Sequence, residues 1–329
     1  MIELCADWQL HSCCYLAWAI HPEWGKNAPR VKSELRGVIT TIAEYEPVKL
    51  LVAPDRIYDA RQQSFGANVE VIEAPVDDIW MRDIIPTFGR RGEEIVAIDW
   101  NFNGWGSTRD RPARSGDKLA RDISIGDDRI SAPFVAEGGA FITDGKGTII
   151  TTRSCLLNEN RNAGKTETEI EEGFSSLGGR QVIWLEGNPA EPITSGHVDG
   201  YVMFGEAGEV FVEGLSGNDR DADVVRARDI DTLRASVDSR GAPLRVNLVA
   251  PPREEFWAEK ISLFAPTYLN AYIANAAVIA AKFGDEERDE SARRALQTAF
   301  PDRQVRMIEI NHIAAGGGGI RCLTQPVPI

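Results

Sequence analysis

The sequence is poor in the groups that build disulfide frameworks and metal clusters. It has five cysteines in 329 residues, none of them in a CxxC pair, and only four histidines. An odd number of cysteines in a large chain argues against a disulfide framework, and the neighbouring Cys13 and Cys14 have no second cluster that would complete a zinc site. We therefore predict free thiols, most of them packed in the core, and no metal site.

Long apolar runs are also missing. The strongest candidate for a membrane span, residues 264–283, is interrupted by a proline, two asparagines and a lysine, which makes it a poor membrane helix. Residues 1–8 carry neither a basic segment nor a long apolar segment, so no secretory signal is evident. We expect a cytoplasmic protein.

The chain has fewer positively charged than negatively charged residues. The chain has 36 lysines and arginines against 50 aspartates and glutamates, which gives a formal net charge of −14. This balance argues against nucleic acid or an anionic membrane surface as a partner and favours a cationic small molecule. The hydrophobic content of 43% is ample for a large core. The composition is compatible with a monomer and with a homo-oligomer.

What the sequence does contain is a recurring order of strand, amphipathic helix and strand. The order appears in residues 140–186, 201–250 and 271–310, and the first of these helices begins with a capping-box pattern at Thr166 and Glu169. A weaker copy starts at residue 77 and reaches a short helix candidate at 118–122. The chain begins with a helix candidate at 31–46 and a strand at 48–54, and it ends with strand-like residues around Cys322.

These two ends complement each other. If the C-terminal strand joins the N-terminal unit, five similar units close into a ring, and each inner strand can direct residues to one central pocket. We therefore predict that residues 1–329 form a single domain.

Four motifs could carry chemistry, although each one alone is compatible with a purely structural role. "TSGHVDGY" holds His197 two residues before Asp199, and a strand starting at Ser195 would point both side chains to one face. "DDIWMRD" sets Asp83 near a tryptophan, and "EGG" begins with Glu137. "GGGGIRCLTQP" brings four glycines just before a cysteine. The remaining histidines are predicted to be structural or in loops: His11, His21 and His312.

The combination is far more specific. "DDIWMRD", "EGGAFITDGKGTIITTRSCLLNENRN", "SGHVDGY", "YLNAYIAN" and "GGGGIRCLTQP" occur in this order and together resemble the agmatine deiminase family and its bacterial peptidylarginine deiminase relatives. The resemblance runs from about Trp80 to Pro326. It implies a single α/β catalytic domain with the pentein α/β-propeller fold, a five-fold pseudosymmetric ring of ββαβ units, which agrees with the repeats.

The resemblance also implies roles for the candidate residues. Cys322 matches the nucleophile, His197 the general acid and base, and Glu137 a carboxylate that orients this histidine. Asp83 and Asp199 match the two carboxylates that hold the guanidinium. Substrate contacts are also expected from three further residues: Trp80, Asn270 and Gly319. No metal or other cofactor is implied.

The chemistry of a guanidinium explains these residue types. Its charge is delocalised and its pKa is very high, so it reacts poorly until it is held in a fixed geometry. Two carboxylates provide charge-assisted hydrogen bonds, the cysteine thiolate attacks the central carbon, and the histidine donates a proton to the leaving ammonia.

The sequence departs from the family pattern in two places. Arg321 stands where relatives often have a histidine before the nucleophile, and residues 275–277 read Asn-Ala-Ala instead of the common "NGG". An arginine at this position could receive an anionic group if it faced the pocket.

The leading interpretation is hydrolysis of agmatine to N-carbamoylputrescine and ammonia through an amidino-cysteine intermediate. Within the same class, a peptidyl-arginine deiminase, a methylated-arginine hydrolase, an amidinotransferase and an enzyme acting on a guanidino acid remain as alternatives. Outside it stand a catalytically silent guanidine-binding protein and a structural protein. The retained cysteine and histidine argue against a protein without catalytic activity, because binding of a guanidine alone needs only the carboxylates.

Overall fold

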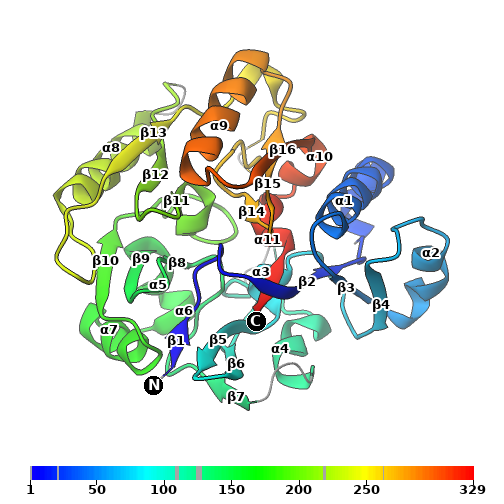
Figure 1. Cartoon of the computed structure of the whole chain (residues 1–329), viewed down its shortest axis with the longest axis horizontal. Coiled ribbons are helices and arrows are strands. Elements are labelled where there is room, and N and C mark those ends of the chain that lie inside the picture. The colour runs from blue at the N-terminus through cyan, green and yellow to red at the C-terminus, as the bar shows by residue number, and fades with distance from the viewer. Residues whose placement is uncertain (1, 21, 108–110, 124–127, 218–219, 262) are drawn as a thin grey trace.

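The computed structural model describes residues 2–20, 22–107, 111–123, 128–217, 220–261 and 263–329. Its strands form five separate sheets arranged around a common centre (Figure 1). Each sheet contains an antiparallel strand pair followed by a parallel strand on the far side. The predicted ring of five ββαβ units is confirmed.

The unit that closes the ring combines both ends of the chain. Its elements are β17 (Gln325–Pro328), β2 (His11–Ala17), α1 (Ala28–Ala43) and β3 (Val48–Val52), extended by α2 (Ile57–Arg61) and β4 (Val69–Glu73). The last strand, β17, pairs antiparallel with β2, and β2 pairs parallel with β3. The prediction that the C-terminal strand joins the N-terminal unit is therefore confirmed.

The other four units follow in sequence order. The second contains β5 (Thr87–Arg91), β6 (Glu94–Asp99), α4 (Leu119–Asp122) and β7 (Asp128–Ser131), with β1 (Glu3–Leu4) added beside β5. The third contains β8 (Phe141–Thr143), β9 (Thr148–Thr152), α5 (Arg153–Leu156), α6 (Glu159–Asn162), α7 (Glu167–Ser176) and β10 (Gln181–Leu185). The fourth contains β11 (Val202–Phe204), β12 (Val210–Glu213), α8 (Arg220–Ala235) and β13 (Val246–Val249). The fifth contains β14 (Tyr272–Ile273), β15 (Ala277–Lys282), α9 (Glu286–Ala299) and β16 (Gln304–Glu309), followed by α10 (Asn311–Ala314) and α11 (Ile320–Leu323).

Local sequence rules account for the helix positions. In α1 the buried residues Val31, Leu35, Val38, Ile39 and Ile42 recur every three or four positions, so the helix lays one apolar face on its sheet. The helix begins three residues earlier than predicted, because a proline is tolerated in the first turn. At α7 the backbone N–H of Glu169 donates to the Thr166 hydroxyl, which confirms the capping box.

Two local predictions were wrong. Cys322 lies in the one-turn helix α11, and the strand starts only at Gln325. His312 lies in α10 rather than in a loop. His197, for which a strand was one possibility, directly precedes the 3₁₀ turn Val198–Gly200. Turns of three or four residues are too short to leave a periodic pattern in the sequence.

The two remaining histidines also had structural predictions. His11 is buried in β2 beside Glu46 and Tyr272, as expected of a structural residue. His21 lies outside the described residues. Within the described ranges, no helix is both long and apolar enough to cross a membrane.

Candidate active site

The predicted site residues come from corresponding places in the five units. Each one lies in the segment just before the first strand of a unit. The residues and the strands they precede are Asp83 (β5), Glu137 (β8), His197 and Asp199 (β11), Asn270 (β14) and Cys322 (β17). Because these first strands lie toward the middle of the ring (Figure 1), residues that are far apart in the sequence meet at its centre.

His197 is surrounded by three carboxylates. Its Nε2 lies 3.3 Å from Oε2 of Glu137, and its Nδ1 lies 3.9 Å from Oδ2 of Asp83 and 3.9 Å from Oδ1 of Asp199. Burial acts to lower the pKa of this histidine, but Asp83, Cys155 and Glu137 outweigh it and raise the pKa well above its usual value. His197 is therefore held as a proton-carrying imidazolium.

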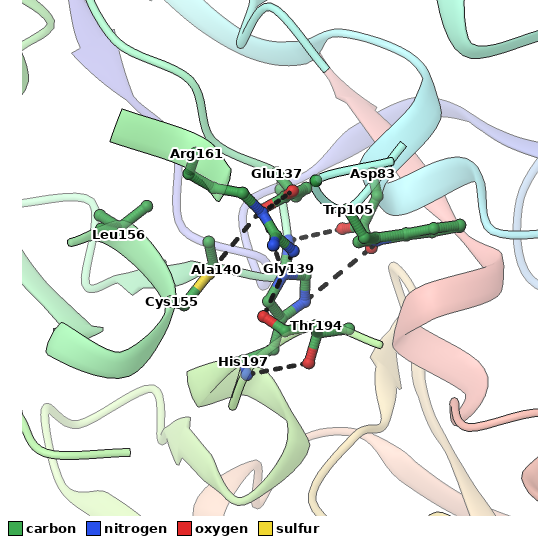
Figure 2. A network of polar contacts seen from close by, with 12 residues as sticks. Asp83, Trp105, Glu137, Gly139, Ala140, Cys155, Leu156, Arg161, Thr194 and His197 are labelled. Carbon is green, nitrogen blue, oxygen red and sulfur yellow. Dashed lines mark hydrogen bonds and ion pairs between the residues drawn. The ribbon is translucent and has the colours of Figure 1, made fainter. Parts of the chain in front are cut away.

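Glu137 is itself fixed from the side opposite His197. Its Oε1 accepts a hydrogen bond of 2.9 Å from Nε of Arg161, and both side chains are fully buried (Figure 2). Burial acts to raise the pKa of Glu137, but Arg161 and His197 together lower it to about 2. The carboxylate therefore stays charged and can orient the imidazole throughout a reaction.

Asp83 is oriented by two neutral donors. The backbone N–H of Gly139 donates to Oδ1 at 2.8 Å, and the indole Nε1 of Trp105 donates to Oδ2 at 2.9 Å (Figure 2). Burial and the nearby Asp199 and Glu137 raise the pKa of Asp83, against the lowering effect of His197. A cation bound beside this carboxylate would relieve that unfavourable crowding of negative charge.

Asp199 is held by the arginine that departs from the family pattern. Nη1 of Arg321 donates to Oδ2 of Asp199 at 2.7 Å, and its Nε donates to Asp7 at 2.6 Å. Arg82 also contacts Asp7, at 3.2 Å. Arg321 is only 6% exposed. It therefore points into the protein and positions Asp199, so it is not placed to receive an anionic ligand.

Cys322 is tied to the same group through Asn270. The backbone N–H of Cys322 donates to Oδ1 of Asn270 at 3.1 Å, and Nδ2 of Asn270 donates to the carbonyl of Asp199 at 3.1 Å. Burial, followed by the charges of Asp199 and Asp83, raises the pKa of the Cys322 thiol well above its usual value. In the empty site the sulfur is a thiol, so it needs a nearby positive charge to become a thiolate.

The glycine run lets side chains pack directly on the backbone beside the nucleophile. A Cβ at Gly318 would come 2.5 Å from the ring of Trp80, and one at Gly319 would come 2.7 Å from Oδ1 of Asn270. Trp80 is buried and packs against the glycine segment. Its assignment as a substrate contact stays a prediction.

A cavity of about 300 Å³ opens beside these residues. His197, Asp199 and Cys322 lie at one end of its lining, together with the backbone of Gly317–Gly319, and Asn270 also contributes. Part of the wall is apolar and includes Trp257, Leu263 and Phe264. This combination of a reactive end and an apolar wall suits a short chain that carries one planar cationic head.

Gly139 is the residue on which the charged groups converge. A Cβ there would lie 2.5 Å from Nδ1 of His197, 3.0 Å from Oδ1 of Asp83 and 3.1 Å from Oδ1 of Asp199. We expect Gly139→Ala to lower kcat/KM by about two powers of ten, because displacing the reacting groups by an ångström can cost that much. Steady-state kinetics with the preferred guanidine will test this.

Gly37→Ala is a matched control, because Gly37 lies inside α1 with no atom within 4 Å of the added methyl group. Normal kinetics in Gly139→Ala would show that the three charged side chains need no such close approach.

Sequence reasoning missed several supporting residues. Arg161, Trp105 and Thr194 hold Glu137, Asp83 and the His197 backbone, respectively. Arg161 and Thr194 lie inside quoted motifs but were not singled out there, and Trp105 lies outside them. The second glycine of "EGG" is the one signal in the sequence that could have pointed to the close approach at Gly139.

Cys155 was predicted to be a core thiol, and it is fully buried. Its Sγ nevertheless lies 3.8 Å from Oε2 of Glu137. Within the described ranges, Glu137, Cys155 and His197 form the group whose donor atoms lie close enough for a metal ion, all within 4.8 Å of one another. The Arg161 guanidinium on Glu137 places a positive charge against that position, which disfavours a dication there.

Comparisons with known proteins point to one family. Residues 3–328 match the Porphyromonas-type peptidyl-arginine deiminase family. The chain is similar to the agmatine deiminase of Medicago truncatula, with 34% identity over 98% of this chain and 95% of that protein. It is also similar to the agmatine deiminase of Pseudomonas aeruginosa strain LESB58, with 32% identity over 98% of this chain and 94% of that protein. The solved structure of the agmatine deiminase of Enterococcus faecalis superposes with a TM-score of 0.89 at 26% identity, covering 99% of this chain and 96% of that chain.

Proposed function

Because the chain belongs to the Porphyromonas-type peptidyl-arginine deiminase family, we propose that it hydrolyses a C–N bond of a guanidinium group, with agmatine as the substrate. The products are N-carbamoylputrescine and ammonia. The single observation that carries this proposal is the convergence of Cys322, His197 and the two aspartates at the centre of the ring.

In the proposed mechanism the guanidinium binds between Asp83 and Asp199. The Cys322 thiolate attacks the central carbon, which forms a C–S bond and a tetrahedral intermediate. His197 donates its proton to one amino group, which leaves as ammonia and takes the bonding electrons with it. A water molecule, deprotonated by the now neutral His197, attacks the same carbon. The C–S bond then breaks with its electrons passing to sulfur, and the added hydroxyl loses its proton to solvent, which releases the neutral ureido product and regenerates the thiolate.

Substrate binding is proposed to create the nucleophile. Burial and the charges of Asp199 and Asp83 raise the pKa of the thiol in the empty site. A guanidinium placed between the two carboxylates neutralises the charges that oppose the thiolate, and the thiol proton is released to solvent. The positive charge of His197 acts in the same direction. The reactive sulfur then forms only when a cation is bound, which protects the thiol at other times.

Agmatine is expected to show a higher kcat/KM than free L-arginine. Four carboxylates line the cavity (Glu191, Asp199, Glu213 and Asp229), against one arginine, Arg226. An α-carboxylate on the substrate would be repelled by most of these groups. Arg321, the other candidate for an anion, is already bound to two protein carboxylates.

The test is a panel of agmatine, L-arginine, a guanidino acid, methylated arginine and an arginine-containing peptide. Released ammonia and ureido product are measured for each compound. A clear preference for arginine, a guanidino acid or the peptide would exclude agmatine as the substrate. Binding of guanidines without turnover of any of them would indicate a silent binding protein.

We further propose that the closed ring acts as a single catalytic domain, since both chain ends contribute to the unit that carries β17. The net charge of −14 supports a cationic small-molecule partner rather than nucleic acid. A cytoplasmic location stays a prediction from the sequence.

A further inference from the structure

The cavity that holds Cys322 continues past Asp199 to a second polar corner. Glu213, Arg226 and Asp229 all line this part of it. Glu213 ends strand β12, and its backbone N–H donates to the carbonyl of Tyr201 at 2.8 Å. Tyr201 lies two residues after Asp199 in the sequence. The corner is therefore close to the turn that carries the guanidinium-binding carboxylate.

Two of the three charged groups in this corner are already committed to protein partners. Asp229 accepts hydrogen bonds from the backbone N–H groups of Glu186 and Gly187 and from the Tyr201 hydroxyl. The Arg226 guanidinium lies flat on the Tyr201 ring, 3.4 Å from its centre. Its Nη1 is buried and has no hydrogen-bond partner among the described residues.

Glu213 has fewer partners, a hydrogen bond from Thr267 and a long ion pair with Arg226, so its carboxylate keeps acceptor positions for a ligand. Its Oε1 lies 3.8 Å from Nη2 of Arg226, which is beyond hydrogen-bond distance, and its side chain is 16% exposed. The carboxylates of Glu191 and Asp229, which line the same cavity, are occupied by backbone and hydroxyl donors. Glu213 is thus the acidic group of this corner that a small cation can reach.

The apolar part of the same cavity suits methylene groups. Trp257 and Phe264 stack with ring centres 5.2 Å apart, and Leu263 lines the same cavity. An alkyl chain that packs on this wall would extend from the guanidinium site toward the polar corner.

We propose that Glu213 binds a second positive charge at the far end of the substrate and thereby selects guanidines that carry a terminal ammonium group. This inference rests on the proposed deiminase function and adds a specificity-determining residue to it. An anionic far end is disfavoured, because the carboxylates outnumber Arg226 and the arginine is stacked on Tyr201.

The ionisation of Glu213 gives a second, independent readout. Burial raises its pKa to about 7; Asp223 acts in the same direction, while Arg226 and a hydrogen bond from Thr267 act against it. Glu213 therefore gains its negative charge as the pH rises through about 7. The preference for a terminal ammonium should increase with pH over the same range.

The experiment compares agmatine with pentylguanidine, which has a methyl group in place of the terminal ammonium. The measured quantity is the ratio of the two kcat/KM values for the wild type and for Glu213→Gln, between pH 6 and pH 8, which spans the pKa of about 7. We expect the ratio to fall about tenfold in Glu213→Gln, mainly through a higher KM for agmatine, as is typical of a lost charged contact. The rise of the ratio with pH should disappear in this variant.

Glu209→Gln is the matched control, because Glu209 immediately precedes β12 but pairs with Arg245 outside the cavity lining. It should keep the wild-type ratio. An equal loss for both guanidines in Glu213→Gln, or a wild-type preference for a guanidino acid, would overturn the role of Glu213 while leaving the deiminase function intact. Failure of the wild type to turn over either guanidine would instead overturn the proposed function, and the inference with it.

Discussion

Replacement of Cys322 by alanine is expected to abolish turnover of every guanidine while guanidine binding persists. In the proposed mechanism the thiol forms the covalent bond, whereas Asp83 and Asp199 hold the substrate and are not altered by the change. Their positions depend on Trp105, Gly139 and Arg321. Ammonia release measures the lost activity, and calorimetric titration with agmatine measures the retained binding.

The same mechanism predicts a covalent intermediate on one sulfur only. A rapid acid quench of the wild type during turnover should trap an amidino adduct, which peptide mass spectrometry should place on Cys322. Cys13→Ala is the control, because this buried thiol of β2 is expected to contribute packing alone. An active Cys322→Ala protein would overturn the mechanism. An adduct on Cys155, whose thiol lies 3.8 Å from Glu137, would do the same.

The sequence predicts the ring because its repeats are local. Strands with apolar runs and helices with one apolar face each leave a pattern within 20 residues or so. The closure of the ring could also be inferred, because the N-terminal unit lacks its first strand and the C-terminal strand lacks a unit of its own. The structure confirms this closure through the pairing of β17 with β2.

The positions of Cys322 and His197 show where local patterns stop being informative. Cys322 was expected among strand-like residues, and a strand was one possibility for His197, yet each lies at a single turn that precedes a strand. The expectation that His197 and Asp199 share a pocket nevertheless agrees with the structure, where Nδ1 and Oδ1 are 3.9 Å apart. The turn, rather than strand alternation, brings them together.

The partners of the site residues could not be predicted, because they depend on the closed ring. Arg321 binds Asp7, which is 314 residues away in the sequence, and Asp199, which is 122 residues away. From the sequence alone, Arg321 could either bind an anionic ligand or pair with carboxylates of the protein. The positions of Asp7 and Asp199 decide for the second possibility. The contact with Asp7 also connects the start of the chain to the residue before the nucleophile.

Asp83→Asn is expected to lower kcat/KM by roughly two to three powers of ten, because it removes one charged partner of the guanidinium. The amide also fits its surroundings poorly, since Asp83 accepts hydrogen bonds from both Gly139 and Trp105 and an amide nitrogen cannot accept either one. Asp128→Asn is the matched control, because Asp128 forms a partly exposed ion pair with Arg91. Near-normal kinetics in Asp83→Asn with every guanidine would remove Asp83 from the binding site.

Asp199→Asn should cause a similar loss of kcat/KM, but it should also destabilise the protein. The variant leaves the buried Arg321 with Asp7 as its remaining charged partner, and breaking a buried ion pair commonly costs several kcal/mol. We expect Tm to fall by about 5 °C or more, whereas Asp83, whose direct donors are neutral, should show a smaller shift. Thermal unfolding of both variants beside their kinetics separates the two roles. An Asp199→Asn protein with wild-type Tm would show that Arg321 does not depend on this carboxylate, and wild-type kinetics would show that the guanidinium does not either.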